Sequence, residues 1–161
     1  LPPPLTRGES MSDFIGARNI LLDQNASSRE EVLKTIAGLS VELGVADDVD
    51  EVYAGFLARE EIDQTGMVDG FAIPHCKTDA VKIASIVAFK NNAPLDWPSL
   101  DGKPVDVAMA LLVPGQEAGT THLKLLSKAA VLLMDEGFKR LLREGEDADL
   151  IARAINEALE K

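Results

Sequence analysis

Cysteine and histidine are scarce in this chain. Its 161 residues include one cysteine, Cys76, and two histidines, His75 and His122. A single cysteine excludes a disulfide within the chain and is consistent with a reducing compartment, so we expect a cytoplasmic protein. A metal site built from nitrogen and sulfur ligands would need nearly all three of these side chains at once.

Long apolar runs and an excess of positive charge are also missing. No stretch approaches the run of about 18 apolar residues that a membrane-spanning helix requires, so we expect no direct membrane insertion. The 16 basic and 27 acidic residues give a net charge of −11. Such a surface repels nucleic-acid phosphates, which argues against nucleic acid as a partner. The length and the apolar fraction of 46% predict one domain with a real core.

The first ten residues contain three consecutive prolines and lack the apolar core of a signal peptide. We interpret residues 1–10 as a disordered arm, either coded or left from an expression vector, in which case Met11 is the natural start. The folded domain is then expected to cover residues 11–161.

Helices are indicated by apolar residues that recur at helical spacing. The first follows Ser28 and Glu31, which have capping-box spacing, and it should stop at Gly44. The second should run from near Asp48 to about Ile62. Three more helices are predicted at about residues 121–134, 138–142 and 148–159.

Four stretches are predicted as strands: residues 20–22, 71–73, 83–89 and 105–113. The last is apolar at nearly every position, which is typical of a central strand covered on both faces. Pro74 favours an extended conformation for the residue before it and should end the strand at residues 71–73. Residues 91–103, with two prolines and Asp101-Gly102, are predicted to form a loop. The pattern predicts an α/β fold, a single domain with a small mixed β-sheet and helices packed on both faces.

His75 is the first candidate for chemistry. A neutral imidazole nitrogen is nucleophilic near neutral pH, and the phosphoramidate that it forms is reactive enough to be passed on. Pro74 fixes the backbone beside it, and Gly70 would allow a phosphate or a partner to approach closely. Its spacing alone also fits a histidine that merely sits at a strand end.

His122 and Arg59 are the other candidates. His122 lies in the first turn of a helix and lines up with its apolar face, where the helix N-terminus should keep the ring neutral. Arg59 lies at the border of the apolar face of its helix, and a planar charged fork suits a phosphoryl group. Taken singly, His122 could be a histidine at the core edge, and Arg59 a solvated arginine balanced by Glu60 and Glu61.

Several ordered motifs resemble a known family. Arg59-Glu60, Thr65-Gly66 and the run Gly70-Phe71-Ala72-Ile73-Pro74-His75 are similar to the signature of the fructose/mannitol-type (type 2) enzyme IIA of the bacterial sugar phosphotransferase system. Trp97, the segment from Ser99 to Val105 and the segment from His122 to Ser127 also match it in content, order and spacing. The resemblance covers the chain from about Asn19 to its C-terminus.

The resemblance implies a phosphoryl relay. His75 would take a phosphoryl group from the phosphocarrier protein HPr and pass it to a cysteine of an enzyme IIB domain. His122 would orient the group and Arg59 would neutralise its charge, with no metal or organic cofactor. The sugar would be chosen elsewhere, in the membrane domain.

Three alternatives stay open. A regulatory enzyme IIA of the nitrogen-related branch would keep the fold and the histidine, although the segment from Trp97 to Val105 looks more like the transport branch. A hydrolase could pair Cys76 with His75 or His122, and a zinc site could use all three. Adjacent residues of a strand point to opposite faces of the sheet. This argues against a Cys76–His75 pair in a hydrolase and against a zinc site that contains both residues.

Overall fold

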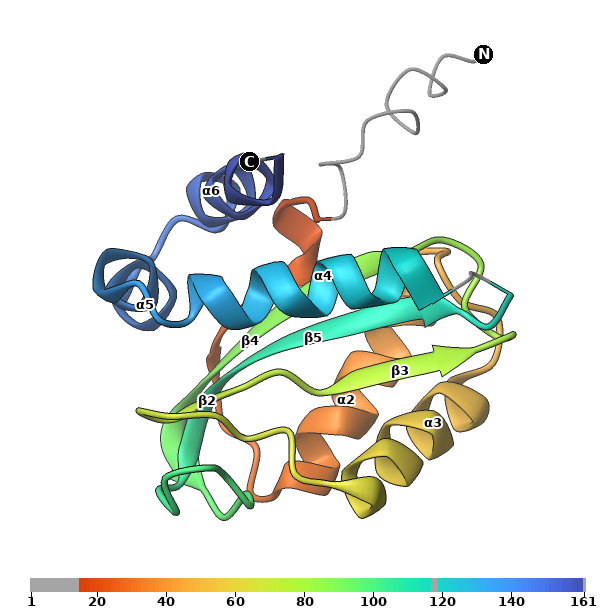
Figure 1. Ribbon diagram of the computed structural model, residues 1–161, viewed down its shortest axis with the longest axis horizontal. Helices are drawn as coiled ribbons and strands as arrows, with labels where there is room; N and C mark the ends of the chain where they lie inside the picture. The colour runs from red at the N-terminus through yellow and green to blue at the C-terminus, as the bar shows by residue number, and fades with distance from the viewer. Residues whose placement is uncertain (1–14, 117–118, 161) are drawn as a thin grey trace.

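A mixed sheet of five strands forms the centre of the molecule in the computed structural model (Figure 1). The structure describes residues 15–116 and 119–160, except for the side chains of residues 119–122 and 160. The predicted arm at residues 1–10 therefore lies outside the described residues. The strands are β1 (Ile20–Gln24), β2 (Phe71–Ala72), β3 (His75–Thr78), β4 (Ser85–Leu95) and β5 (Val105–Pro114).

The strand order is β1-β4-β5-β2, and β3 continues along β5 beyond β2. β4 and β5 are antiparallel, whereas β1 runs parallel to β4, and β2 and β3 run parallel to β5. Successive residues of β5 alternate between the two faces, and nearly all are buried, because both faces of the sheet are covered. The predicted central strand at residues 105–113 is thus confirmed.

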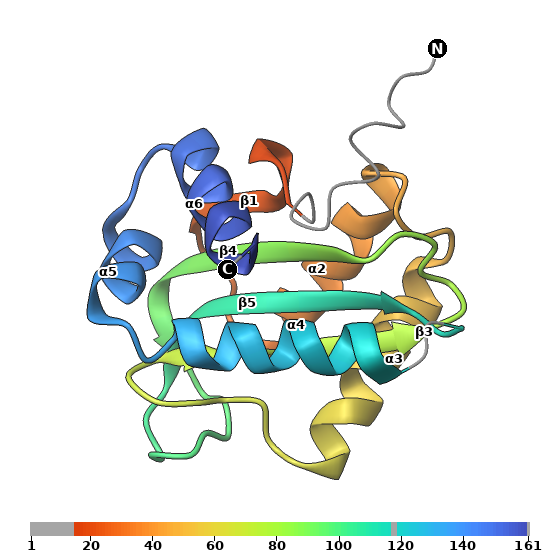
Figure 2. The ribbon, with the colours of Figure 1, turned by 45° about the horizontal axis from the view of Figure 1, so that its top comes forward.

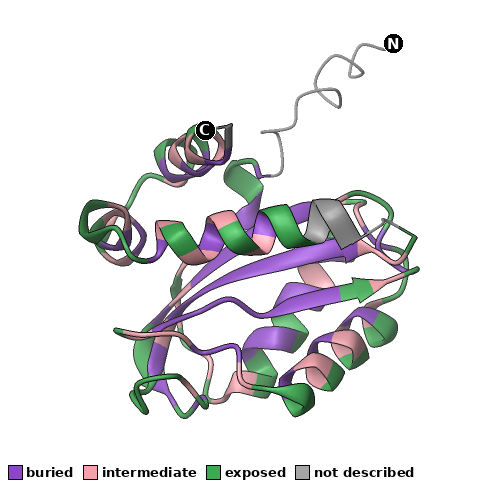
Figure 3. Ribbon diagram, in the orientation of Figure 1, coloured by how far each residue is buried: buried purple, intermediate pink, exposed green. Residues whose placement is uncertain are grey.

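Helices cover both faces of the sheet (Figure 2). α2 (Arg29–Glu42) and α3 (Val49–Ile62) pack on one face, and α4 (Gly119–Leu132), α5 (Glu136–Glu144) and α6 (Ala148–Glu160) pack on the other, near the short helix η1 (Ala17–Asn19). Figure 3 shows the result as buried strands between helices whose outer sides are exposed. The predicted α/β fold with helices on both faces is confirmed.

The helix starts follow local side chains. Ser28 caps α2 by accepting a hydrogen bond from the backbone N–H of Glu31, and Asp48 caps α3 through Glu51 in the same way. Asp135 caps α5 through Phe138, so this helix begins two residues before the predicted start. The cap at Asp48 sets the start of α3, whose last turn contains Arg59.

The prediction of a loop from residue 91 is wrong at its beginning. β4 continues to Leu95, although Pro94 lies within it and its pairing is irregular after Lys90. The reason is Asn91, whose buried amide accepts from Ala26 N–H and donates to the carbonyls of Ala26 and Ala93. These contacts hold the extended backbone in place of regular ladder bonds.

The strand predicted at residues 71–73 does end before Pro74, as β2 (Phe71–Ala72), but a separate strand that was not predicted, β3, begins directly after the proline. Phe71 pairs with Val107 and His75 pairs with Leu111, so the register along β5 is the same on both sides of the proline. The Pro74 carbonyl still accepts from Leu111 N–H at 2.9 Å. The missing N–H costs one donor only, and the ladder resumes with His75 as the first residue of β3.

Candidate functional site

Both ring nitrogens of His75 are engaged. Nδ1 lies 2.9 Å from the carbonyl oxygen of Ile73, and Nε2 lies 2.8 Å from Nε of Arg59. A carbonyl oxygen can only accept and a guanidinium can only donate, so Nδ1 carries the proton and Nε2 presents its lone pair. The ring is neutral, and Nε2 is its nucleophilic atom. The residue is only 6% exposed, so it is buried more deeply than a histidine at a strand rim.

Arg59 reaches this ring from the other side of the sheet. α3 packs on the face that Cys76 enters, and alternation along β3 turns the neighbouring His75 toward the opposite face. The two side chains meet because β3 lies at the edge of the sheet, with no further strand beyond it among the described residues. Nη1 of Arg59 also donates to the Asp63 carbonyl at the end of α3. Its predicted border position, half-buried, is confirmed.

The third predicted residue, His122, lies in the first turns of α4, and its side chain falls outside the described residues. The helix stripe that follows it is confirmed, because Leu125, Ala129 and Leu133 are buried against the sheet. α4 covers the face that His75 enters and begins above the C-terminal ends of β3 and β5 (Figure 1). A role for His122 remains a prediction.

Cys76 does not share the histidine's environment. It is 1% exposed, and its Sγ lies 3.4 Å from the carbonyl oxygen of Val52 on α3. Burial, and secondarily the charge of Glu51, raises the pKa of the thiol to about 12. A thiol that stays protonated near neutral pH is a poor nucleophile and a poor metal ligand, which disfavours the hydrolase and zinc interpretations.

Glu60 is not the solvated partner of Arg59 that the sequence allowed. Its side chain is 2% exposed, and Oε2 accepts a hydrogen bond from the buried hydroxyl of Thr65. Burial raises the pKa of this carboxyl, against smaller opposing effects of Thr65 and Arg29. The Glu60 and Thr65 of the signature therefore form one buried contact between the end of α3 and the turn that follows it.

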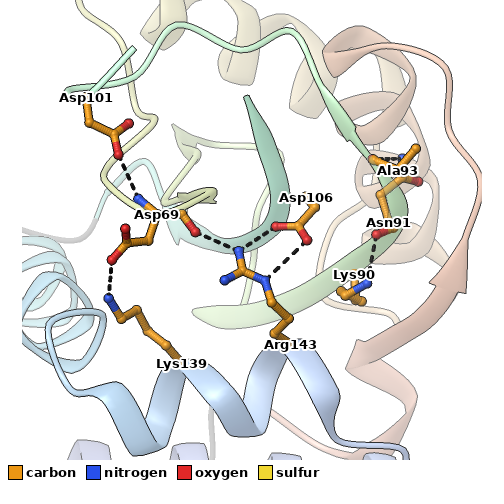
Figure 4. A network of polar contacts seen from close by, with 8 residues as sticks. All are labelled: Asp69, Lys90, Asn91, Ala93, Asp101, Asp106, Lys139 and Arg143. Atoms are coloured by element: carbon orange, nitrogen blue, oxygen red, sulfur yellow. Dashed lines mark hydrogen bonds and ion pairs between the residues drawn. The ribbon is translucent and has the colours of Figure 1, made fainter. Parts of the chain in front are cut away.

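A second polar cluster lies at the other end of β2 (Figure 4). Lys139 Nζ lies 2.6 Å from Asp69 Oδ2, which raises the pKa of Lys139 and lowers that of Asp69. Arg143 pairs with both carboxylate oxygens of Asp106, donates to the Asp69 carbonyl, and stacks 4.4 Å above the ring centre of Phe71. These partners are 37 to 74 residues apart, so no local sequence signal indicates them.

The cluster borders an open cleft of about 570 Å³ that excludes His75. Lys139 and Arg143 are neutralised there by carboxylates, so their interactions fix α5 to the turn before β2. Gly70 packs against this cluster: its φ is +86°, and a Cβ there would lie 2.6 Å from Nη2 of Arg143. The approach of a phosphate or a partner at Gly70 stays a prediction.

A sequence model of the family described as "phosphoenolpyruvate-dependent sugar phosphotransferase system, EIIA 2" matches residues 13–158. The chain belongs to the EIIA 2 family. The match spans every described strand and nearly all of the last helix, and it confirms the resemblance that the motifs indicated.

Curated relatives of this EIIA 2 domain carry different names. The fructose-specific EIIA component of Haloferax volcanii is 30% identical over 88% of this chain and 91% of its own length. A nitrogen regulatory protein of Bradyrhizobium diazoefficiens is 34% identical over 88% of this chain and 91% of its own. The 2-O-alpha-mannosyl-D-glycerate-specific EIIABC component of Escherichia coli is 30% identical over 86% of this chain, which spans only 21% of that protein.

Solved structures share the EIIA 2 fold. The nitrogen regulatory protein IIA-Ntr of Neisseria meningitidis superposes with a TM-score of 0.82 at 28% identity, covering 91% of this chain and 98% of that one. Mannitol enzyme IIA of E. coli, in complex with phosphorylated enzyme IIB, superposes with a TM-score of 0.71 at 19% identity over 91% and 96% of the chains. No helix in the described part of the EIIA 2 domain has the length and apolarity to cross a membrane.

Proposed function

We propose that this EIIA 2 domain is a phosphocarrier that accepts a phosphoryl group from HPr on Nε2 of His75 and passes it to a cysteine of an enzyme IIB domain. The observation that carries the proposal is the tautomer of His75. The Ile73 carbonyl holds the proton on Nδ1 and leaves the lone pair on Nε2, beside a permanent cation.

The first transfer forms a bond between Nε2 and phosphorus as the bond between phosphorus and the HPr histidine breaks. Nδ1 keeps its proton throughout, because the Ile73 carbonyl continues to accept it. In the second transfer the bond between Nε2 and phosphorus breaks. A cysteine thiolate of the IIB partner attacks phosphorus, and the electron pair of the broken bond returns to Nε2. No proton needs to leave or enter His75 in either step.

Arg59 has two roles in this scheme. In the resting protein its Nε–H occupies the lone pair of Nε2 at 2.8 Å, so the guanidinium must shift before phosphorus can approach. Once the group is bound, the charged fork neutralises its oxygens. His122 would orient the same group from the start of α4.

The test is incubation with phosphoenolpyruvate, enzyme I and HPr, followed by mapping of the labelled residue. We expect one phosphoryl group on His75, labile in acid and stable in alkali. His75→Ala should abolish labelling, and labelling of this variant at the wild-type rate would overturn the assignment.

The roles of Arg59 and His122 are tested by single-turnover exchange with HPr. Removing one stabilising donor typically costs about 2.7–4 kcal/mol, or about a hundred- to a thousandfold in rate. We expect losses of this size for Arg59→Ala and smaller ones for Arg59→Lys and His122→Gln. Arg153→Ala is the matched control, since Arg153 is exposed and, among the described residues, its one ion pair is with Asp149 at 4.0 Å. Wild-type rates for both Arg59→Ala and His122→Gln would reduce the site to His75 alone.

A regulatory role in the nitrogen-related branch is the second candidate, and the similarity to IIA-Ntr favours it. The segment that favours transport contains Trp97 and Val105, both buried in the core, so it reflects packing as much as function. The two roles share the first transfer and differ in the second. Transfer from phosphorylated His75 to the cysteine of a fructose- or mannitol-type IIB domain supports transport, and a stable phosphoprotein that no IIB domain discharges supports regulation.

A further inference from the structure

Glu60 connects to the His75 ring through hydrogen bonds. Its Oε2 accepts from the hydroxyl of Thr65. The Thr65 carbonyl accepts from Ile73 N–H at 2.9 Å, and the Ile73 carbonyl accepts from Nδ1 of His75 at 2.9 Å. The carboxyl group thus supports the acceptor that fixes the proton on Nδ1.

Glu60 is also the chain neighbour of the donor at the other ring nitrogen. Arg59 precedes it on α3 and donates from Nε to Nε2 of His75. The Glu60–Thr65 contact ties the end of α3, which carries this donor, to the turn beside β2, which supports Ile73. This side-chain contact therefore helps to set the distance between the two groups that hold the ring.

Packing alone does not account for a carboxyl group at this position. Glu60 Oε1 and Trp97 Nε1 are both buried, and neither makes a hydrogen bond of good geometry among the described residues, although a weak interaction with Trp97 slightly opposes the rise in the Glu60 pKa. The nearest cation, Nη1 of Arg29, is 3.8 Å from Oε1, a long ion pair. Burying a carboxyl with incomplete partners is unfavourable, and an apolar side chain would fill the space at lower cost.

We infer that Glu60 is a positioning residue, which through Thr65 sets the geometry of Arg59 and His75 and thereby the rate of phosphoryl transfer. The inference rests on the proposed function for its rate effect, although the state of the ring can be measured without any transfer. Glu60 would act through Thr65 and Arg59, and among the hydrogen bonds of the described residues it makes none to the ring itself.

The turn has a second anchor, so the domain should fold without the Glu60–Thr65 contact. Gly66 N–H donates to the Pro98 carbonyl at 3.2 Å, and the Gly66 backbone bridges both Ala72 and Ser99. These backbone contacts do not involve Glu60. Its loss should therefore loosen the site and leave the turn in place.

The variants are Glu60→Ala, Glu60→Gln, Thr65→Val and the double variant Glu60→Ala/Thr65→Val. Glu61→Ala is the control, since Glu61 is the next residue on α3 and is exposed. Gln can keep the contact, because a threonine hydroxyl both donates and accepts. Two measurements are made on each: single-turnover transfer from phospho-HPr, and the ¹⁵N NMR signals of the His75 ring nitrogens in the unphosphorylated protein.

We expect transfer to slow by about ten- to a hundredfold in Glu60→Ala and Thr65→Val, the range for a small misplacement of reacting groups. The double variant should transfer no more slowly than either single variant, because both changes remove the same contact. The rate of Glu60→Gln should stay within about threefold of wild type, and the rate of Glu61→Ala should be unchanged. The ring signals should show a mixture of tautomers in Glu60→Ala, Thr65→Val and the double variant, and the wild-type tautomer in Glu60→Gln and Glu61→Ala.

Wild-type ring signals in both variants would overturn the inference, and so would equal losses in Glu60→Gln and Glu60→Ala or multiplied losses in the double variant. If the wild-type protein accepts no phosphoryl group at all, the proposed function fails, and the ring signals still decide whether Glu60 positions His75.

Discussion

Replacing Gly55 by alanine would test how closely α3 must pack against β3. A Cβ at Gly55 would lie 2.5 Å from Sγ of Cys76 and 3.7 Å from its Cβ. Sγ is buried and bonded to the Val52 carbonyl, so either the thiol must rotate into a filled space or the helix must move away. Gly55 is one turn before Arg59 and Cys76 is next to His75, so this movement would separate the two site residues.

Two effects of known size oppose each other. Alanine is about 1 kcal/mol more favourable than glycine inside a helix, whereas overpacking a filled core costs about 1–3 kcal/mol. We therefore expect Gly55→Ala to lie between neutral and about 2 kcal/mol less stable than wild type. In a Cys76→Ala background the nearest of these contacts is the ordinary one at 3.7 Å, and the same change should stabilise by about 1 kcal/mol.

The assay is urea denaturation of the four proteins of this cycle, together with transfer rates from phospho-HPr. The coupling free energy between the two sites should be about 1–3 kcal/mol, and the transfer rate lost in Gly55→Ala should return in the double variant. Gly38→Ala in α2 is the control, because a Cβ there meets nothing within 4 Å. Additive effects of Gly55→Ala and Cys76→Ala would refute the reasoning.

Three further predictions concern buried and paired charges. Burial raises the pKa of Glu60 above its ordinary value of 4.5, so the folded state binds this proton more tightly and loses stability as pH rises through that raised pKa. The free energy of unfolding of Glu60→Gln, measured by urea denaturation, should therefore increase relative to that of wild type between pH 4 and pH 8. An unchanged difference would contradict this. The Cys76 thiol, with a pKa of about 12, should react with iodoacetamide at pH 8 only in denaturant, and reaction at the unfolded rate in the native protein would show that the thiol is accessible. Arg143→Met should cost about 1–2 kcal/mol of stability, since it leaves Asp106 without its bidentate partner. As a control, Arg153→Met should change stability by less than about 0.5 kcal/mol. Equal losses would mean that the ion pair of Arg143 contributes no more than an exposed ion pair.

Local patterns predicted most of the fold. The caps at Ser28 and Asp48, the helical stripes and the apolar run of β5 depend on residues close together in the chain, and the structure confirms them. The end of β4 and the strand after Pro74 depend on distant partners. Asn91 bonds to Ala26 across 65 residues, and β3 exists because β5 continues beside it.

The sequence indicated that His75 and Arg59 belong together, but not the geometry of their contact. The family motifs pointed to His75 and Arg59, and the structure brings the two together. The tautomer of His75 could not be predicted, because it depends on how the backbone after Ile73 turns a carbonyl toward Nδ1. The burial of Glu60 was missed as well, since a charged residue near a helix end usually faces water.

The position of His75 at the edge of the sheet bears on self-association. An open edge can recruit a strand from another molecule and so lead to aggregation. β3 is a poor edge for an incoming strand to pair with. It is only four residues long, it follows a proline that has no N–H, and it carries the exposed charge of Lys77. The hydroxyl of Thr78 is already bonded to Glu51 on α3. The same edge can therefore carry His75 without becoming a template for the protein's own copies.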